Sequence, residues 1–254
     1  MSYIIAVANQ KGGVGKTTTA VNVAAGLAAA KYSVLIVDLD PQGNATSGLG
    51  LDKEGQQTTY EVLLGTAGLA DSVQETRIPG LYVLPANQNL AAAELDIASL
   101  PHREYRLQEA LKTAIYDYII IDCPPALGLL TINALTCATH VLIPVQTEYY
   151  ALEGLGQLLG TVQRVRQATN PSLDLLGVVL TMYDSRTSLS QQVKAEIKTH
   201  FADKLFSSVI PRNVRLAEAP SYGKTVFEHD KWSKGARAYK QVAREVIKRT
   251  GGER

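Results

Sequence analysis

The twelve residues from Asn9 to Ala20 have the sequence NQKGGVGKTTTA, and they constrain every other interpretation of the chain. They follow an apolar run, YIIAVA at Tyr3–Ala8, and they lead into an alanine-rich stretch of helical character. A buried strand, a glycine-rich turn and a helix in this order form the context in which backbone N–H groups surround phosphate oxygens. The segment therefore predicts a phosphate-binding loop.

This loop departs from the usual pattern G-x-x-x-x-G-K-[ST]. Gln10 stands where the first glycine is expected, and an extra lysine, Lys11, follows it. Within the ordinary part of the pattern, we expect Lys16 to place its charge on the β- and γ-phosphates and the Thr17 hydroxyl to hold Mg²⁺. The other predicted nucleotide contacts in the loop are Gly12, Gly13, Val14, Gly15 and Thr18.

Aspartates follow two further apolar runs. LIVDLDPQGN contains Asp38 at the end of a predicted strand and Asp40 two residues later, and YIIID ends with Asp122. In a parallel sheet the carboxyl ends of the strands line the ligand crevice. We predict that Asp122 is the Walker B carboxylate near Mg²⁺ and that Asp38 supports the metal or its waters. A single aspartate at a strand end is more often a cap or turn residue, but three beside one phosphate loop favour a metal site.

Short apolar runs alternate with longer helical patterns along the chain. Strands are predicted at Tyr3–Ala8, Ser33–Asp38, Leu81–Pro85, Tyr118–Asp122, His140–Val145, Leu175–Thr181 and Leu205–Pro211. Helices are predicted at Thr17–Ala30, Thr58–Leu64, Ala151–Ala168, Leu189–Phe201 and Gly235–Arg249. Nearly continuous apolar strands are typical of parallel sheets buried on both faces. We therefore predict an α/β fold, a mostly parallel twisted sheet with helices on both faces, in a single domain spanning residues 1–254.

The bulk composition is that of an ordinary globular protein, with 254 residues of which 46% are hydrophobic and 19% charged. Two cysteines, Cys123 and Cys137, are too few for a disulfide framework and favour a reducing, cytoplasmic setting. We expect no signal peptide, because no charged segment followed by a long apolar run begins the chain.

The net charge of +1 conceals a strong asymmetry. Residues 1–185 contain 10 Lys and Arg against 17 Asp and Glu, a net charge of −7. Residues 186–254 contain 15 against 7, a net charge of +8. Such asymmetry often indicates a polyanionic partner, although chance clustering on a solvated face explains it equally well on charge alone.

Several motifs together resemble the ParA/Soj family of chromosome- and plasmid-partition ATPases. They are KGGVGKTTTA, VDLDPQGNATSGLG, YIIIDCPP, LTINAL, PVQTEYYALEGL and VIPRNVRLAEAPSYGKT. The phosphate loop alone indicates only the wider MinD-like group with a deviant Walker A motif, whereas DLDPQGN and IPRNVRLAEAPS are more specific to the partition branch. The resemblance extends from Tyr3 to about Thr225 and resumes at GARAY.

The resemblance implies how this chain handles ATP and Mg²⁺. In this family two subunits face each other and enclose two nucleotides, and the extra lysine contacts the phosphates of the opposite subunit. Lys11 is implied in that role, and together with Lys16 it offsets charge on the γ-phosphate. Asp40 matches the catalytic aspartate and orients the attacking water. Pro211 and Asn213 are implied as adenine contacts, although a helix cap with a proline turn explains them as well.

The resemblance also implies a DNA surface and a protein partner. The ATP-bound homodimer binds double-stranded DNA without sequence preference, and a ParB/Spo0J-type centromere-binding protein stimulates hydrolysis. The implied DNA contacts are Arg186, Arg215, Lys224, Lys231 and Lys234. No recognition helix or zinc-ligand spacing is evident, so phosphate contacts remain. We expect a cytoplasmic, nucleoid-associated protein without a membrane partner.

Two alternatives stay open at this point. A MinD-like membrane-associated ATPase would use the amphipathic, basic segment Gly235–Arg249, although its apolar side lacks Phe, Leu and Trp. An iron–sulfur reductase resembling the nitrogenase iron protein would use Cys123 and Cys137, although lone cysteines are more often small buried hydrophobes. Lys231-Trp232 stands where relatives commonly have a proline-containing turn, which leaves the roles of Lys231 and Lys234 open.

Overall fold

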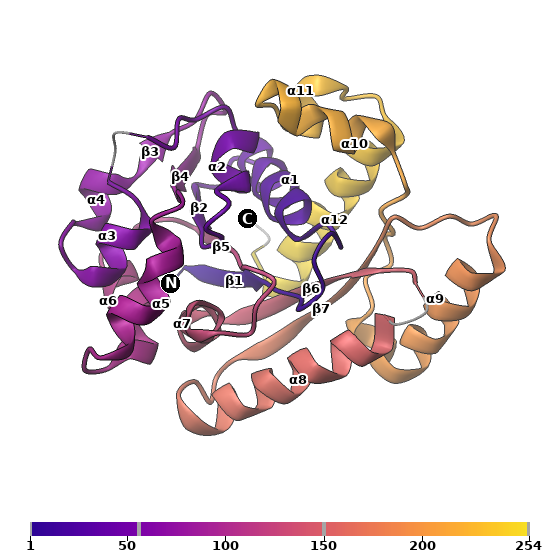
Figure 1. Ribbon diagram of the computed structural model, residues 1–254. Helices are drawn as coiled ribbons and strands as arrows, with labels where there is room; N and C mark the ends of the chain where they lie inside the picture. Colours follow the sequence, from indigo (N-terminus) through magenta and orange to yellow (C-terminus); the bar gives the residue numbers. More distant parts are fainter. Residues whose placement is uncertain (1, 55–56, 149–150, 253–254) are drawn as a thin grey trace.

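A sheet in the order β3-β4-β2-β5-β1-β6-β7 runs through the protein (Figure 1). The computed structural model describes residues 2–54, 57–148 and 151–252. All neighbouring strands in this part of the chain are parallel except β3 and β4, which are antiparallel. The strands are β1 (Tyr3–Val7), β2 (Val34–Asp38), β3 (Gln74–Glu75), β4 (Leu81–Leu84), β5 (Tyr118–Asp122), β6 (His140–Gln146) and β7 (Asp174–Thr181). The predicted α/β class with a mostly parallel sheet is confirmed.

Helices cover both faces of this sheet (Figure 1). One face carries α1 (Lys16–Ala29), α2 (Asn44–Gly48), α10 (Val214–Glu218), α11 (Val226–His229) and α12 (Lys234–Thr250). The other carries α3 (Thr59–Leu64), α4 (Leu69–Ser72), α5 (Leu90–Ala98), α6 (Arg106–Leu111), α7 (Leu129–Cys137), α8 (Ala151–Ala168) and α9 (Ser188–Phe201).

The apolar strands divide their side chains between two cores. In β5, Ile119 and Ile121 belong to the core under α3–α9, whereas Tyr118 and Ile120 belong to the core under α1 and α12. Successive strand residues point to opposite faces, so a strand covered on both sides needs apolar residues at every position. All five residues of β5 are buried, as the continuous apolar pattern predicts.

The prediction of a strand at Leu205–Pro211 is wrong. This segment makes only isolated bridges, Val178 to Leu205 and Tyr183 to Pro211. Phe206 N donates to the Val178 carbonyl and Ile210 N to the Leu180 carbonyl, both at 2.8 Å, so a step of four residues along this segment matches a step of two along β7. The residues between them leave the ladder, and Ser207 donates its N–H to the Glu245 carboxylate at 3.0 Å. The sequence also did not predict β3 or several of the short helices.

The C-terminal helix α12 is fastened to α1, the helix behind the glycine-rich loop. The hydroxyls of Thr19 and Tyr239 lie 3.0 Å apart in a buried hydrogen bond. A Cβ added to Gly26 would lie 2.6 Å from the Ala243 side chain, so the two helices can approach this closely only with glycine there. Asn22 of α1 also accepts a hydrogen bond from Val226 N at 2.9 Å.

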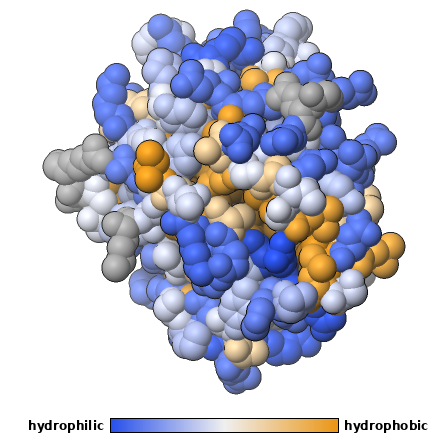
Figure 2. Space-filling model, turned by 90° about the vertical axis from the view of Figure 1, so that its left-hand side faces the viewer, coloured by the Kyte–Doolittle hydropathy of each residue, from blue (hydrophilic) through white to orange (hydrophobic). Residues whose placement is uncertain are grey.

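The left-hand side of the molecule in Figure 1 faces the viewer in Figure 2. This face is largely hydrophilic, with apolar side chains gathered in a hollow near its centre and at one side (Figure 2). Within the described residues, no helix combines the length and apolar character needed to span a bilayer.

Candidate functional site

The glycine-rich loop leaves the carboxyl end of β1 and leads into the first turn of α1. Gly13 and Gly15 have φ angles of 74° and 86°, in the left-handed region that favours glycine. Gly15 is the N-cap of α1, so the N–H groups of the first helical turn face the loop. The backbone is thus arranged to bind an anion, as the sequence predicted.

Lys16 folds back into this loop. Its ammonium donates a hydrogen bond to the Lys11 carbonyl oxygen at 3.0 Å, and the residue is only 7% exposed. Burial lowers the pKa of Lys16, while the negative charges of Asp122 and Asp40 act in the opposite direction. The Lys16 ammonium lies at an anion-binding loop with carboxylates nearby, and this arrangement is suited to binding a phosphate that carries Mg²⁺.

Asp38 and Asp122 are paired in register at the carboxyl ends of β2 and β5, and both are fully buried. The Asp38 carboxylate accepts hydrogen bonds from the Thr46 N–H at 2.9 Å and the Thr46 hydroxyl at 2.7 Å. Burial raises the pKa of Asp38 despite these bonds. Thr46 thus occupies one oxygen of Asp38, and the other oxygen accepts the Asp40 N–H at 3.3 Å.

Asp122 differs from Asp38, because neither of its carboxylate oxygens has a hydrogen-bond partner among the described residues. Burial and the charge of Asp38 raise its pKa well above the usual range. The Thr17 hydroxyl is close enough to lower that pKa but does not complete a hydrogen bond. A buried unpaired carboxylate is costly. A hydrated cation beside Thr17 and Asp122 would remove that cost, so these residues fit Mg²⁺.

No set of three or more His, Cys, Asp or Glu side chains in the described part of the chain is arranged to hold a metal by itself. Mg²⁺ typically binds through one or two carboxylates together with phosphate and water oxygens. Asp40 lies at the rim of this corner, half-buried, with one carboxylate oxygen accepting the Gln42 N–H at 2.9 Å. Its negative charge acts on the pKa of both Lys16 and Asp122.

A cavity of about 300 Å³ continues from the loop toward the C-terminal segments. Its lining includes Gly15, Thr18, Thr181, Met182, Pro211 and Asn213. The predicted base contacts Pro211 and Asn213 therefore share one cavity with the phosphate loop. Asn213 is also the N-cap of α10, since its side-chain oxygen accepts the Arg215 N–H at 3.0 Å. The helix-cap explanation and the binding explanation thus both apply to this residue.

The extra lysine of the loop points away from Lys16. Lys11 forms an ion pair with Glu148, and Gln146 donates a hydrogen bond to the same carboxylate. The sequence analysis assigned no role to Glu148, although it belongs to the PVQTEYYALEGL motif. Next to Lys11, a Cβ added to Gly12 would meet no atom within 4 Å. The space around Gly12 is thus open in the single chain.

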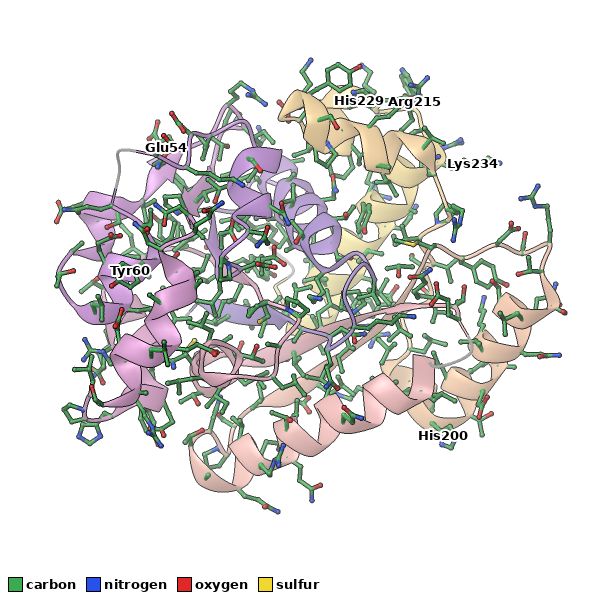
Figure 3. All side chains as sticks on the ribbon, viewed as in Figure 1. Glu54, Tyr60, His200, Arg215, His229 and Lys234 are labelled. Carbon is green, nitrogen blue, oxygen red and sulfur yellow. The ribbon has the colours of Figure 1, made fainter. Side chains whose placement is uncertain are left out.

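The predicted DNA-contacting residues lie on neighbouring surface segments. Backbone hydrogen bonds from Tyr183 N to Ile210 O (2.9 Å) and from Arg212 N to Tyr183 O (3.3 Å) join the loop that carries Arg186 to the segment before Arg215. The Arg186 side chain is 87% exposed and pairs with Asp184. Figure 3 shows Arg215 and Lys234 on the same side of the molecule. Lys224 and Lys231 are exposed on the loops between them.

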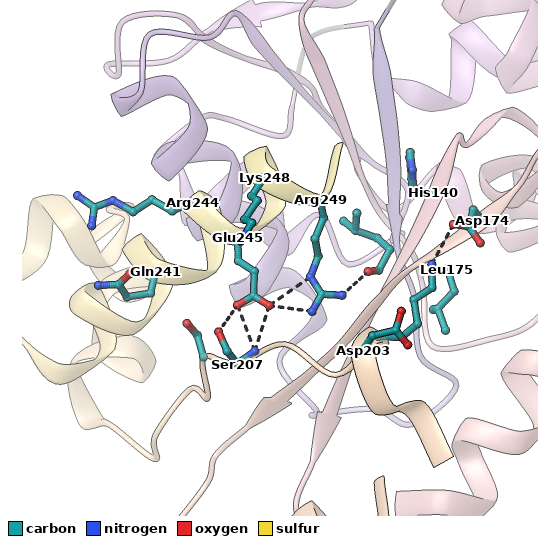
Figure 4. Close-up of a pocket in the computed structure, with 13 residues that line it drawn as sticks. His140, Asp174, Leu175, Asp203, Ser207, Gln241, Arg244, Glu245, Lys248 and Arg249 are labelled. Atoms are coloured by element: carbon teal, nitrogen blue, oxygen red, sulfur yellow. Dashed lines mark hydrogen bonds and ion pairs between the residues drawn. The ribbon is translucent and has the colours of Figure 1, made fainter. Parts of the chain in front are cut away.

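A larger cavity, of about 690 Å³, lies at the amino ends of β6 and β7, opposite the phosphate loop (Figure 4). Several of its charged groups bind one another. Glu245 accepts from the Ser207 hydroxyl at 2.8 Å and pairs with Arg249 at 2.8 Å, while Arg249 also donates to the Leu176 carbonyl at 2.9 Å. This network fastens α12 to β7 and explains the structure of the segment after Leu205.

The two alternative functions are disfavoured by burial. Cys123 and Cys137 are buried, and burial raises the pKa of both thiols, that of Cys137 to about 12. Thiolates that could hold a cluster between subunits are therefore not available there. The apolar side of α12, including Tyr239 and Val246, is also buried, so it does not face a lipid surface.

Comparisons with known proteins agree with this geometry. A family model described as an AAA domain matches residues 2–175. The chromosome partitioning protein ParA of Caulobacter vibrioides is 50% identical over 251 residues, covering 97% of this chain and 94% of that protein. The sporulation initiation inhibitor protein Soj of Bacillus subtilis is 54% identical over 249 residues, covering 97% and 98%.

Solved structures show the same architecture. A cobyrinic acid a,c-diamide synthase from Mycobacterium smegmatis with bound ADP and magnesium has a TM-score of 0.87 and 40% identity, covering 100% of this chain and 97% of that one. The septum site-determining protein MinD of Pyrococcus horikoshii, complexed with Mg-ADP, has a TM-score of 0.81 and 28% identity, covering 99% and 98%. With relatives at 50% identity or more over nearly its whole length, the chain belongs to the ParA/Soj family of chromosome-partitioning P-loop ATPases.

Proposed function

We propose that residues 1–254 act as one Mg²⁺-dependent ATPase domain that partitions DNA, hydrolysing ATP to ADP and phosphate. The observation that carries this proposal is the fully buried Asp122, whose two oxygens lack partners within the described residues beside the phosphate loop. The names of the relatives support the biological role, and the ADP and magnesium bound to a similar structure support the ligands.

Four residues of the site have distinct roles in this proposal. Lys16 leaves the Lys11 carbonyl and binds the β- and γ-phosphates, and the Thr17 hydroxyl and Asp122 hold the hydrated metal. Bound Mg²⁺ neutralises part of the phosphate charge. Asp40 orients the attacking water and does not need to remove its proton early, because phosphoryl transfer depends mainly on positioning and charge. Hydrolysis is slow without a stimulating partner.

ATP binding drives assembly of a homodimer in this scheme. Lys11 releases Glu148 of its own chain and binds the phosphates of the nucleotide that a second copy holds. The extra negative charge of a triphosphate over a diphosphate favours that exchange, which ties assembly to ATP. The open space at Gly12 supports a close approach of the second copy.

The dimer binds double-stranded DNA through phosphate contacts made by Arg186, Arg215, Lys224, Lys231 and Lys234. If roughly 3–4 of these five residues reach phosphates in each subunit, a dimer supplies roughly 6–8 contacts, and the binding constant rises by orders of magnitude. DNA affinity therefore reports ATP occupancy. A ParB/Spo0J-type protein stimulates hydrolysis and release, and the protein is cytoplasmic and nucleoid-associated.

The name of the Mycobacterium smegmatis structure, cobyrinic acid a,c-diamide synthase, describes that protein. We do not carry it over, because the relatives with higher identity over nearly the whole chain are partition proteins.

Size measurements with ADP, with ATP, and with ATP plus DNA test the proposal. We expect a monomer with ADP, a dimer with ATP and a DNA-bound dimer in the third sample. A protein that neither binds ATP nor changes its size would contradict it.

A further inference from the structure

Two aromatic side chains stand out on the surface that carries Arg215. Trp232 is 77% exposed and Tyr222 is 65% exposed. Trp232 lies in the loop between α11 and α12, and Tyr222 ends the turn before α11. Large aromatic side chains dominate interface energetics, and exposing two of them has no benefit for the stability of the single chain.

Local contacts fix the backbone that presents these rings. Trp232 N donates to the Asp230 carboxylate at 3.1 Å, and the other oxygen of Asp230 lies 3.5 Å from Arg215 Nε. The next residue, Ser233, caps α12 by accepting the Ala236 N–H at 3.1 Å. The main chain on both sides of Trp232 is therefore anchored while its ring stays in solvent.

Tyr222 is connected to the same arginine from the other side. Its ring stacks on the His229 ring with a centroid distance of 5.1 Å and an interplanar angle of 26°. His229 Nε2 lies 3.4 Å from Glu218, which pairs with Arg215 Nη1 at 2.8 Å. Figure 3 shows His229 beside Arg215. Tyr222 is thus linked to Arg215 through the stacked His229 and Glu218, and the backbone of Trp232 is linked to it through Asp230.

The charge of this surface favours a polyanion. Residues 212–240 contain seven Lys and Arg and three acidic residues. Two of the acids, Glu218 and Asp230, already pair with Arg215, and the third, Glu228, pairs with Arg77 at 3.5 Å. Lys224, Lys231 and Lys234 form no ion pair within the described residues. Lys231 lies 5.3 Å above the Trp232 ring, so cation and ring are presented together.

We propose that Trp232 and Tyr222 contact duplex DNA directly, packing their rings against sugars and base edges while Lys224, Lys231 and Lys234 bind phosphates. The inference rests on the proposed DNA-binding function and adds to it a contact that salt does not screen. A second copy of this positive surface would be repelled, which excludes self-association here. Two separate rings also provide less apolar area than an interfacial membrane helix requires.

Salt dependence separates ring contacts from phosphate contacts. The slope of log K against log salt reports the number of neutralised phosphates, at about −0.9 per contact. We expect Trp232→Ala to weaken binding of a labelled duplex by roughly fivefold or more, with the slope unchanged. Trp232→Phe should retain most of the affinity. Lys231→Gln and Lys234→Gln should each reduce the magnitude of the slope by about one.

The chain has one tryptophan and 12 tyrosines, so fluorescence excited at wavelengths that tyrosine does not absorb reports on Trp232 alone. Adding duplex DNA to the ATP-saturated protein should quench or shift this fluorescence. The inference is overturned if the wild type binds DNA while its fluorescence and the affinity of Trp232→Ala stay unchanged; the proposed function would survive that result. It is also overturned if vesicles of anionic phospholipid change the fluorescence and DNA does not. Failure of the ATP-saturated wild type to bind DNA would overturn the proposed DNA binding as well.

Discussion

Lys11 and Glu148 form an ion pair whose side chains are each 42% exposed, across the mouth of the phosphate loop. Exposed ion pairs contribute only about 0–1 kcal/mol to stability. The contact can therefore hold the Lys11 side chain in the isolated chain and still yield to a stronger anion. A phosphate group bound by a second copy of the protein is such an anion.

We expect Lys11→Ala to bind ATP but to remain monomeric, because Lys16 and the loop backbone still hold the phosphates of the same chain. Equilibrium binding of a fluorescent ATP analogue and light scattering of the ATP-loaded protein measure the two properties. A Lys11→Ala dimer of wild-type stability would contradict the role across the interface.

Gly12→Val tests the same interface by shape instead of charge. The added side chain begins in open space in the single chain, so the variant should fold, and Lys16 and Thr17 should still hold ATP in the same chain. It should fail to dimerise, because in the proposed dimer the second subunit approaches this position. Sedimentation with ATP checks the outcome, and thermal unfolding without nucleotide is the control for folding.

Asp40→Ala should give a dimer that binds ATP and does not turn it over. The change removes the carboxylate that orients water and leaves Lys16, Thr17 and Asp122 in place. We expect the single-turnover rate to fall about 10²-fold or more. Hydrolysis at the wild-type rate would move the catalytic role to another residue.

Asp122→Asn should stabilise the metal-free protein at neutral pH. The pKa of Asp122 is raised in the folded state, so the folded protein favours the protonated carboxyl. The free energy of unfolding therefore falls as pH rises above about 4, the pKa of this group in the unfolded chain, and it stops falling above the pKa in the folded chain. Asparagine cannot ionise and removes that loss. The difference in Tm between variant and wild type should therefore increase with pH, with each kcal/mol shifting Tm by roughly 2–4 °C.

Adding Mg²⁺ and ATP should raise the Tm of the wild type more than that of Asp122→Asn, because the carboxylate then has its cation. An equal increase in both proteins would show that Asp122 does not hold the metal.

Arg186→Glu combined with Arg215→Glu should abolish co-sedimentation with DNA in the presence of ATP and spare nucleotide binding. Both side chains are exposed, so the fold should tolerate the changes. Lys112→Glu, at the exposed residue that follows α6, is the control for charge reversal elsewhere and should leave DNA binding intact. Unchanged co-sedimentation of the double variant would place the DNA surface elsewhere.

The sequence predicted the features that depend on local chemistry. The positions of Lys16, Thr17 and Asp122 followed from a glycine pattern and from strands that are apolar at every residue. The fold class followed from the alternation of such strands with helical segments. Each of these sequence patterns lies within one or two consecutive helices or strands, so it can be recognised without the tertiary structure.

The remaining features depend on residues that are distant in the chain. Glu148 meets Lys11 across 137 positions, and Glu245 accepts the Ser207 N–H in the segment where a strand was predicted. The Thr46 hydroxyl binds an oxygen of Asp38 that the sequence analysis had assigned to support of the metal. The sequence around each of these residues gives no indication of its distant partner. Only the three-dimensional structure could therefore reveal these contacts.

The hydrogen bond between Thr19 and Tyr239 has a mechanical consequence. It joins α1, which starts at the phosphate loop, to α12, which starts beside the basic loops, and the two helices pack directly against each other. We therefore expect the two helices to move as one rigid lever, with little bending inside a subunit. ATP binding would then change the DNA affinity by changing the number of subunits in the assembly, and not by changing the conformation of each subunit.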